Sequence, residues 1–300
     1  MINSITSSNH ITIVTATDNH YVILLAALIK SVEVNHVSDE IIDIYIVGDK
    51  LSDDNIGKLK GSYTSPKIVL HFLKMNEVIP KDMNLPLDKS SWPLNIYMRL
   101  FIPYFLPKEI SRIIYLDVDM IALKDVSLLW STDLKGKIIG AVKDQMDVVS
   151  NPWGGILNYK NFGMESTDNY FNSGLLVIDR EKWEGFEVTK KVIQCVDANK
   201  EFANFPDQYG LNVVLHKNWL SLPPQWNCFS NIDMEDPHII HFYQRKPIYK
   251  TYDKNPVYKD LFYKFLNQTK WQGHQPVSET SRYIKKIKNI IEKIKINPFK

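Results

Sequence analysis

Short apolar runs and amphipathic segments alternate along the first part of the chain. Three segments rich in β-branched residues predict β-strands: residues 11–14, 42–47 and 67–73. Residues 15–20 predict a polar turn. A helix with one apolar face is then predicted by Val22, Leu25, Ala26 and Ile29. Ser52 is a typical N-cap for a second helix that runs to Leu59. Strands that alternate with helices predict an α/β fold with a largely parallel, doubly wound sheet.

Polar side chains adjoin several of the predicted strands. In sheets of this kind, ligands bind beyond the carboxyl ends of the strands. Thr17 and Asp18 follow the first strand, and Asp117 and Asp119 follow the apolar run RIIYL. Further candidates lie next to later apolar runs: Asp144, Asn172, Asp207, Gln208 and His241. These positions predict a ligand site at one edge of the sheet.

The composition is typical of a folded globular protein. Of 300 residues, 44% are hydrophobic and 12% are aromatic, which supplies enough apolar surface to offset the entropy lost on folding. Two cysteines, Cys195 and Cys228, are too few for a disulfide scaffold or a multi-cysteine metal cluster, and they favour a reducing compartment. No linker divides residues 1–270, so we expect one domain there and a separate tail at residues 271–300.

The charge is distributed unevenly along the chain. Residues 281–300 contain seven basic residues and one acidic residue, which leaves 29 basic and 33 acidic residues in the rest. A mildly acidic body argues against a nucleic-acid partner. No signal-peptide pattern is recognisable, and the longest apolar stretch, residues 21–29, is about half the length that spans a bilayer. We therefore expect neither nucleic-acid binding nor a membrane span.

Asp117 and Asp119, within YLDVDM, form the strongest local chemical signal. Carboxylates at positions i and i+2 of an extended backbone point to the same side, so both can bind one hard divalent cation. The apolar strand before them places them at the mouth of the sheet. The alternative is a solvated strand end that carries two unrelated acids, because the D-x-D pattern is short and common.

Five sequence blocks together resemble glycosyltransferase family 8. In chain order they are NIYMRL, YLDVD, YFNSGLLVIDREKW, PDQYGLN and HFYQRKP. Their order and spacing match over about residues 11–265, and the pattern is most similar to bacterial lipopolysaccharide and lipooligosaccharide galactosyl- and glucosyltransferases. The resemblance implies a GT-A fold, with a Rossmann-like, mostly parallel central sheet flanked by helices, in a catalytic domain at residues 1–270. It also implies retaining transfer of galactose or glucose from a UDP-hexose to a glycan or lipid-linked glycan acceptor.

The resemblance implies that Asp117, Asp119 and His241 hold Mn²⁺, or Mg²⁺, against the two phosphates of the donor. The chemistry agrees, since an oxygen-rich site with one imidazole suits Mn²⁺ better than Zn²⁺. Taken alone, His241 is more typical of an ordinary strand histidine. His238, three residues earlier, serves as the comparison.

The donor-binding residues implied by the resemblance are Thr17, Asp18, His20, Tyr21, Arg99, Val118 and Lys246. His20 stands where an asparagine is common in the family. The segment HFYQRKP is one residue shorter than the usual pattern and lacks its glycine, so Arg245 offers a second charge for phosphate beside Lys246. From local sequence, Asp18 equally fits the N-cap of the following helix.

The reaction centre implied by the resemblance consists of Asn172, Asp207, Gln208 and Asp144. The match places Gln208 on the β-face of the anomeric carbon, where a carboxylate would suggest double displacement. An amide is a poor nucleophile, which favours front-face transfer with an α-linked product and electrostatic stabilisation by Gln208. Asp207 also fits the N-cap of the helix that follows it.

The tail predicts a basic amphipathic helix. Its apolar stripe consists of Ile284, Ile287, Ile291 and Ile294, with Ile290 beside it. Lysines occupy the flanks or the opposite face. This pattern suits the anionic inner face of a bacterial membrane and predicts a cytoplasmic, peripheral location. The alternative is that the stripe docks on the catalytic domain or on another chain.

Two other functions compete with this interpretation. A relative that binds UDP-sugars without catalysis fits the altered HFYQRKP segment. Aspartyl-phosphate phosphohydrolases also use a D-x-D at a strand end, but their pattern expects Thr or Val, near the start of the core, where this chain has Ile121 at mid-sequence. The phosphohydrolase interpretation is therefore disfavoured.

Overall fold

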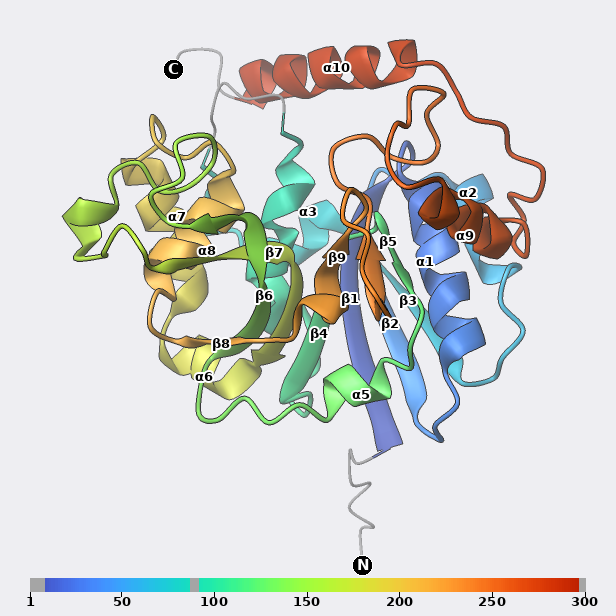
Figure 1. Ribbon diagram of the computed structural model, residues 1–300, viewed down its shortest axis with the longest axis horizontal. Coiled ribbons are helices and arrows are strands. Elements are labelled where there is room, and N and C mark those ends of the chain that lie inside the picture. The colour runs from blue at the N-terminus through green and yellow to red at the C-terminus, as the bar shows by residue number, and fades with distance from the viewer. Residues whose placement is uncertain (1–8, 87–91, 297–300) are drawn as a thin grey trace, which may run out of the picture.

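A computed structural model describes residues 9–86 and 92–296 (Figure 1). Its main sheet has seven strands in the order β3-β2-β1-β4-β7-β6-β8. Their bounds are β1 His10–Asp18, β2 Ile41–Asp49, β3 Ile68–Lys74, β4 Arg112–Leu116, β6 Ile139–Val148, β7 Asn169–Asp179 and β8 Trp219–Ser221. β7 is antiparallel to β4 and β6, and the other neighbouring strands are parallel. The predicted α/β fold with a mostly parallel sheet is confirmed.

A three-stranded sheet and a set of helices complete the fold. The small sheet has the order β5-β10-β9, with β5 Met120–Ala122, β9 Cys228–Phe229 and β10 Ile239–His241. The longer helical segments are α1 Val22–Asn35, α2 Asp53–Lys60, η2 Leu94–Phe101, α7 Val188–Ala198, α8 Pro206–Val214, α9 Pro256–Leu266 and α10 Thr280–Ile296. The shorter ones are α3 Met75–Val78, α4 Ile102–Phe105, α5 Ser127–Trp130, η3 Tyr159–Phe162, α6 Arg180–Gly185 and η4 Pro224–Asn227.

Both faces of the main sheet are buried, as a parallel sheet requires. Successive side chains of a strand point to opposite faces. Ile13 of β1 therefore packs in the core that contains α1 and α9, whereas Val14 packs in the core that contains α7 and α8. Ile114 and Tyr115 of β4 divide between the two cores in the same way. This layered packing leaves the carboxyl ends of the strands as the edge that carries polar residues.

The predicted elements agree with the structure in place but differ at their ends. The Ser52 side chain accepts a hydrogen bond from the Asn55 N–H at 3.3 Å and caps α2, as predicted. The predicted polar turn at residues 15–20 is wrong in its first half, because β1 continues to Asp18. Parallel pairing with β2 extends to Asp18 opposite Asp49, and Thr15 and Thr17 are fully buried. The prediction ended the strand too early because the threonines in the buried part of β1 are polar.

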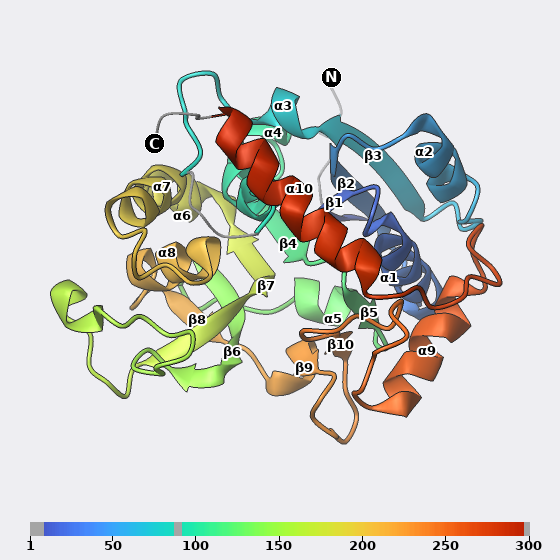
Figure 2. The ribbon, with the colours of Figure 1, turned by 90° about the horizontal axis from the view of Figure 1, so that it is seen from above.

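α10 lies across the carboxyl-end edge of the main sheet, as Figures 1 and 2 both show. Its isoleucine stripe faces outward: Ile284, Ile287, Ile291 and Ile294 are 48, 57, 45 and 58% exposed. The alternative in which this stripe docks on the catalytic domain is therefore wrong. The opposite face contacts the body through ion pairs of Lys285 with Asp18 and of Glu292 with Lys50.

Among the helices that the structure describes, none combines the length and the hydropathy needed to span a membrane.

Candidate active site

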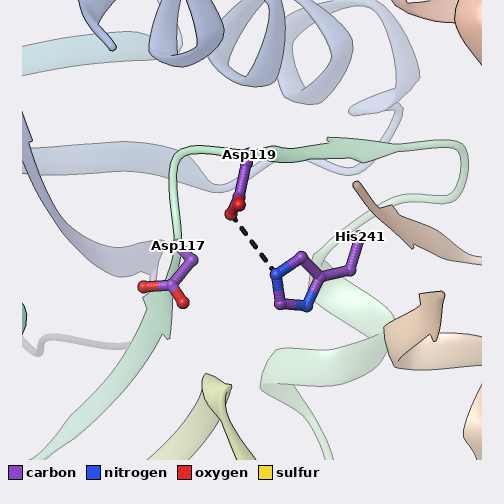
Figure 3. Close-up of side chains that lie close together, drawn as sticks. All are labelled: Asp117, Asp119 and His241. Atoms are coloured by element: carbon purple, nitrogen blue, oxygen red, sulfur yellow. Dashed lines mark ion pairs between the residues drawn. The ribbon is translucent and has the colours of Figure 1, made fainter. Parts of the chain in front are cut away.

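Asp117, Asp119 and His241 meet at the junction of the two sheets (Figure 3). The aspartates flank Val118 in the short connection from β4 to β5. Antiparallel pairing of β5 with β10 sets His241 opposite Met120, and the Phe242 N–H donates to the Asp119 carbonyl at 2.8 Å. One ligand atom from each of the three side chains lies within 4.8 Å of the others. Two carboxylates and one imidazole around a common point are a fitting ligand set for Mn²⁺ or Mg²⁺.

The neighbouring charges favour the ionised form of Asp119 more than that of Asp117. The His241 Nε2 lies 3.3 Å from Asp119 Oδ1, and the Lys246 ammonium pairs with the other oxygen of Asp119. Burial opposes ionisation of Asp119, but the positive charge of Lys246 holds its pKa below the ordinary value. Burial raises the pKa of Asp117, against the opposing charge of Arg99. A bound cation would favour the ionised form of both.

Arg99, from η2, connects the cation ligands to the next group of predicted residues. Its guanidinium lies 2.8 Å from Asp117 Oδ1 and 3.1 Å from Asp207 Oδ2, and only 5% of its side chain is exposed. It also stacks over the Tyr115 ring at 4.5 Å, while the Tyr115 hydroxyl donates to Asp117 at 2.8 Å. A buried arginine with two carboxylate partners fixes the position of both.

The four residues predicted as the reaction centre form one buried network. The Asn172 amide donates to Asp144 Oδ2 at 2.8 Å, and the Gln208 amide donates to the same oxygen at 3.2 Å. Gln208 Oε1 accepts from the Ser173 N–H at 2.9 Å, and the Ser173 hydroxyl donates to Asp207 at 3.1 Å. All four are at most 9% exposed. Strands β6 and β7 and the first turn of α8 bring them together.

Two interpretations of the α8 start are corrected by the structure. Pro206 is the first residue of α8 and Phe205 is its N-cap, so Asp207 and Gln208 belong to the first turn rather than preceding the helix. The alternative role of Asp207 as the N-cap is wrong. Its carboxylate instead faces Arg99 and Ser173.

The turn after β1 holds the predicted nucleotide-binding residues. Asp18 Oδ1 accepts hydrogen bonds from the N–H groups of His20 and Tyr21 at 2.9 and 3.0 Å. Asp18 therefore stabilises the turn before α1, but the N-cap of this helix is Tyr21. His20 Nε2 lies 2.7 Å from the Tyr249 hydroxyl. Thr17 is buried below this turn and contacts the Asp18 carbonyl through its hydroxyl at 3.3 Å.

Lys285 of α10 covers this turn, and the sequence offered no local signal for it. Its ammonium pairs with Asp18 Oδ2 and lies 3.7 Å from the centre of the Tyr21 ring. Only 13% of the Lys285 side chain and 15% of the Asp18 side chain are exposed. Burial lowers the pKa of Lys285, while Asp18 opposes that shift.

Arg245 and Lys246, the two basic residues of HFYQRKP, point to different partners in the structure. Lys246 faces Asp119 and also donates to the Phe242 carbonyl at 2.7 Å, so it lies beside the cation ligands. Arg245 pairs with Glu279 at 2.8 Å and donates to the Thr251 hydroxyl at 2.8 Å. Arg245 is thus held away from Lys246 by Glu279, and its role as a second charge for phosphate stays a prediction.

His238 and Val118 are the other residues of this region that the sequence singled out. His238 lies outside the cluster, 3.6 Å from Asp236 and against the Trp226 ring. Val118 is half-buried and packs against the core that contains α1.

Two further residues around the site were not predicted: Tyr115 and Asn227. Asn227 is 1% exposed and lies between His241 and Asn172. Its only sequence signal is an amide residue within the apolar run WNCF. Such a residue must find hydrogen-bond partners inside the fold, but the pattern does not say which ones.

Comparisons with known proteins agree with this geometry. The family model described as glycosyl transferase family 8 matches residues 12–251. General stress protein A of Bacillus subtilis (strain 168) is 27% identical over 283 residues, covering 86% of this chain and 94% of the relative. A lipopolysaccharide 1,2-glucosyltransferase of Escherichia coli (strain K12) is 26% identical over 234 residues, covering 77% of this chain and 66% of the relative. The solved structure of galactosyltransferase LgtC, in complex with donor and acceptor sugar analogs, superposes with a TM-score of 0.70 at 21% identity, covering 87% of this chain and 96% of that one.

Proposed function

This chain belongs to glycosyl transferase family 8, and we propose that it transfers galactose or glucose from a UDP-sugar to a glycan acceptor with retention of configuration. One observation carries the proposal: Arg99 joins the three cation ligands to the buried polar network of Asn172, Asp144 and Gln208 through its contacts with Asp117 and Asp207. A cation site joined to a buried polar network suits a diphosphate leaving group attached to a sugar.

Asp117, Asp119 and His241 would hold Mn²⁺ or Mg²⁺, which supplies Lewis-acid neutralisation of the charge that develops on departing UDP. Lys246 lies next to this position and adds positive charge for the phosphates. Arg99 keeps Asp117 oriented and simultaneously holds Asp207 in the sugar pocket. These fixed charges need little reorganisation when the donor reacts.

Gln208 is the residue that says most about the mechanism of retaining transfer. Its side chain is an uncharged amide held by Ser173, Asn172 and Asp144, and it is a poor nucleophile. A carboxylate at this position would suggest double displacement. The arrangement supports front-face transfer to an α-linked product, with the Gln208 carbonyl oxygen stabilising positive charge at the anomeric carbon.

The acceptor proposal rests on a relative and on α10. One relative is a lipopolysaccharide 1,2-glucosyltransferase, which suggests a glycan or lipid-linked glycan acceptor in cell-surface polysaccharide synthesis. The outward isoleucine stripe and the exposed Lys288 and Lys295 of α10 suit an anionic lipid surface. We place residues 271–300 at the cytoplasmic face of the membrane, as a surface-binding segment of the catalytic domain at residues 1–270.

Two assays test the proposal. Purified protein with Mn²⁺ should release UDP from UDP-galactose or UDP-glucose, faster with a glycan acceptor, and EDTA should stop the release. Binding of UDP with no turnover of any donor would instead indicate a non-catalytic relative. For the tail, sedimentation should show binding to anionic but not neutral vesicles, weakened by salt and lost when the chain ends at Glu279. Equal binding of the truncated protein would contradict the membrane assignment.

A further inference from the structure

Asn227 ends η4 in the interior of the protein, between the proposed cation ligands and the polar network around Asn172. Its Oδ1 lies 3.0 Å from His241 Nδ1. Its Nδ2 donates to Asn172 Oδ1, also at 3.0 Å. One buried amide therefore contacts a cation ligand on one side and a reaction-centre residue on the other.

The direction of these hydrogen bonds follows from a backbone group. The Gly174 N–H can only donate, and it donates to Asn172 Oδ1 at 2.9 Å. The Asn172 amide nitrogen consequently faces the Asp144 carboxylate at 2.8 Å, where a donor is required. The contacts with Gly174 and with Asp144 therefore require the same orientation of the Asn172 amide.

This orientation determines the proton position on His241. Because Asn172 Oδ1 is an acceptor, Asn227 must present its NH₂ group to Asn172 and its carbonyl oxygen to His241. The Nδ1 of His241 is then the protonated ring nitrogen, and the lone pair of neutral imidazole lies on Nε2. Figure 3 shows this second nitrogen directed at Asp119, whose Oδ1 is 3.3 Å away.

We propose that Asn227 is a positioning residue: it holds His241 in the tautomer whose Nε2 can bind a divalent cation and ties that histidine to Asn172 of the sugar pocket. The inference rests on the proposed cation-dependent function. Two acceptors, Nε2 and a carboxylate oxygen, face each other across 3.3 Å, an arrangement that a shared cation makes favourable. The same amide would fix the position of the cation relative to that of the sugar.

Two substitutions separate the contacts of Asn227. Asn227→Leu removes both hydrogen bonds, and we expect Mn²⁺ affinity, measured by the electron paramagnetic resonance of free Mn²⁺ in the presence of UDP, to fall by roughly 10- to 100-fold. Asn227→Asp keeps an acceptor for His241 but loses the donor to Asn172. It should retain about wild-type Mn²⁺ affinity while kcat falls. Wild-type Mn²⁺ affinity in Asn227→Leu, or an equal loss in both variants, would overturn the proposal.

Asn158→Leu is the matched control. Asn158 is also a buried asparagine, but its partners are Tyr209 and Asn199 rather than cation ligands. This variant should bind Mn²⁺ as the wild type does, even where its stability is lower. If it loses Mn²⁺ affinity as Asn227→Leu does, the effect is a general loss of packing and the positioning role is refuted.

The tautomer can be read in the unmodified protein, which keeps the proposal testable if a variant does not fold. Long-range ¹H–¹⁵N correlation spectra of histidine-labelled protein, at a pH where the ring is neutral, should show His241 protonated at Nδ1. The His241 signals are identified by their absence in His241→Gln. Protonation at Nε2 would overturn the inference. Absence of Mn²⁺ binding by the wild type with UDP would refute the proposed function itself, a result distinct from unchanged binding in Asn227→Leu.

Discussion

The proposed cation side of the site, formed by Asp117, Asp119 and His241, is held by neighbours at the strand ends. The proposed nucleotide side is instead covered by a residue near the C-terminal end of the chain. Arg99, Tyr115 and Asn227 orient the cation ligands through hydrogen bonds inside the body of the protein. On the nucleotide side, which comprises Asp18, His20 and Tyr21, Lys285 of α10 pairs with Asp18 and lies over Tyr21.

The difference concerns what must change when a donor binds. One ligand atom from each of Asp117, Asp119 and His241 already lies within 4.8 Å of the others, so binding of the proposed cation needs little rearrangement. The outer oxygen of Asp18 is already paired with an ammonium group, and a nucleotide that uses this carboxylate must displace Lys285. Substitutions on the cation side should therefore act on turnover, and substitutions in α10 on nucleotide affinity.

The largest effect is expected for Asp119→Asn. Loss of this carboxylate weakens cation binding and removes several kcal/mol of stabilisation of the leaving diphosphate, so turnover should fall by about three orders of magnitude. UDP release measures the rate, and circular dichroism checks the fold. His238→Gln, a change outside the cluster, should retain activity. Full activity of Asp119→Asn in EDTA would contradict a role for the cation in turnover.

A smaller loss is expected for Gln208→Ala. Removing an electrostatic contact made mainly in the transition state should lower kcat by about 10²-fold and leave the Kd for UDP nearly unchanged. Single-turnover kinetics and calorimetric UDP titration separate the two quantities. Gln268→Ala, in the exposed turn that follows α9, is the matched control. Equal changes in kcat and Kd would assign Gln208 to donor binding instead.

On the nucleotide side, Lys285→Ala should make UDP bind more tightly, by about fivefold or less. Both side chains are largely shielded from water, so the desolvation cost offsets most of the Coulomb attraction and the net worth of the pair is about 1 kcal/mol. Without Lys285, Asp18 is available to the nucleotide. Calorimetric titration of UDP with Mn²⁺ measures the change, and Lys288→Ala on the exposed face of α10 is the control. Weaker UDP binding would show that Lys285 contributes to the nucleotide site and does not compete with it.

Asp125→Asn should affect stability only and so separates global from local effects. Burial opposes ionisation of Asp125, but the N–H groups of Ser127, Val37 and Ser38, together with His36, hold its pKa below the ordinary value. The resulting stabilisation, about 1–3 kcal/mol, is present above about pH 4 and is lost as the pH falls towards the folded-state pKa.

Urea unfolding across pH 2–7 measures this dependence. The wild type should lose more stability than Asp125→Asn as the pH falls below about 4, and the variant should keep wild-type kcat and Kd at pH 7. Parallel curves for the two proteins would contradict the role of Asp125. A change in UDP affinity would show that nucleotide binding responds to global stability.

The two sides of the site also differ in how far sequence could predict them. The short spacing of Asp117 and Asp119 after a predicted strand indicated a shared site, and the family resemblance adds His241. The extended backbone predicted for this segment is wrong, because residues 118 and 119 form a turn. The pairing of Lys285 with Asp18 joins positions 267 residues apart and depends on where α10 docks. No periodicity encodes that docking. The separation of Arg245 from Lys246 likewise depends on Glu279, a distant partner.

The anomeric configuration of the first product tests the central claim most directly. The protein, Mn²⁺ and either UDP-galactose or UDP-glucose are incubated with galactose- and glucose-terminated oligosaccharides, and the initial product is analysed by proton NMR. Retaining transfer at the site of Asp117, Asp119, His241 and Gln208 predicts a new α-linkage. A β-linked initial product would contradict the account.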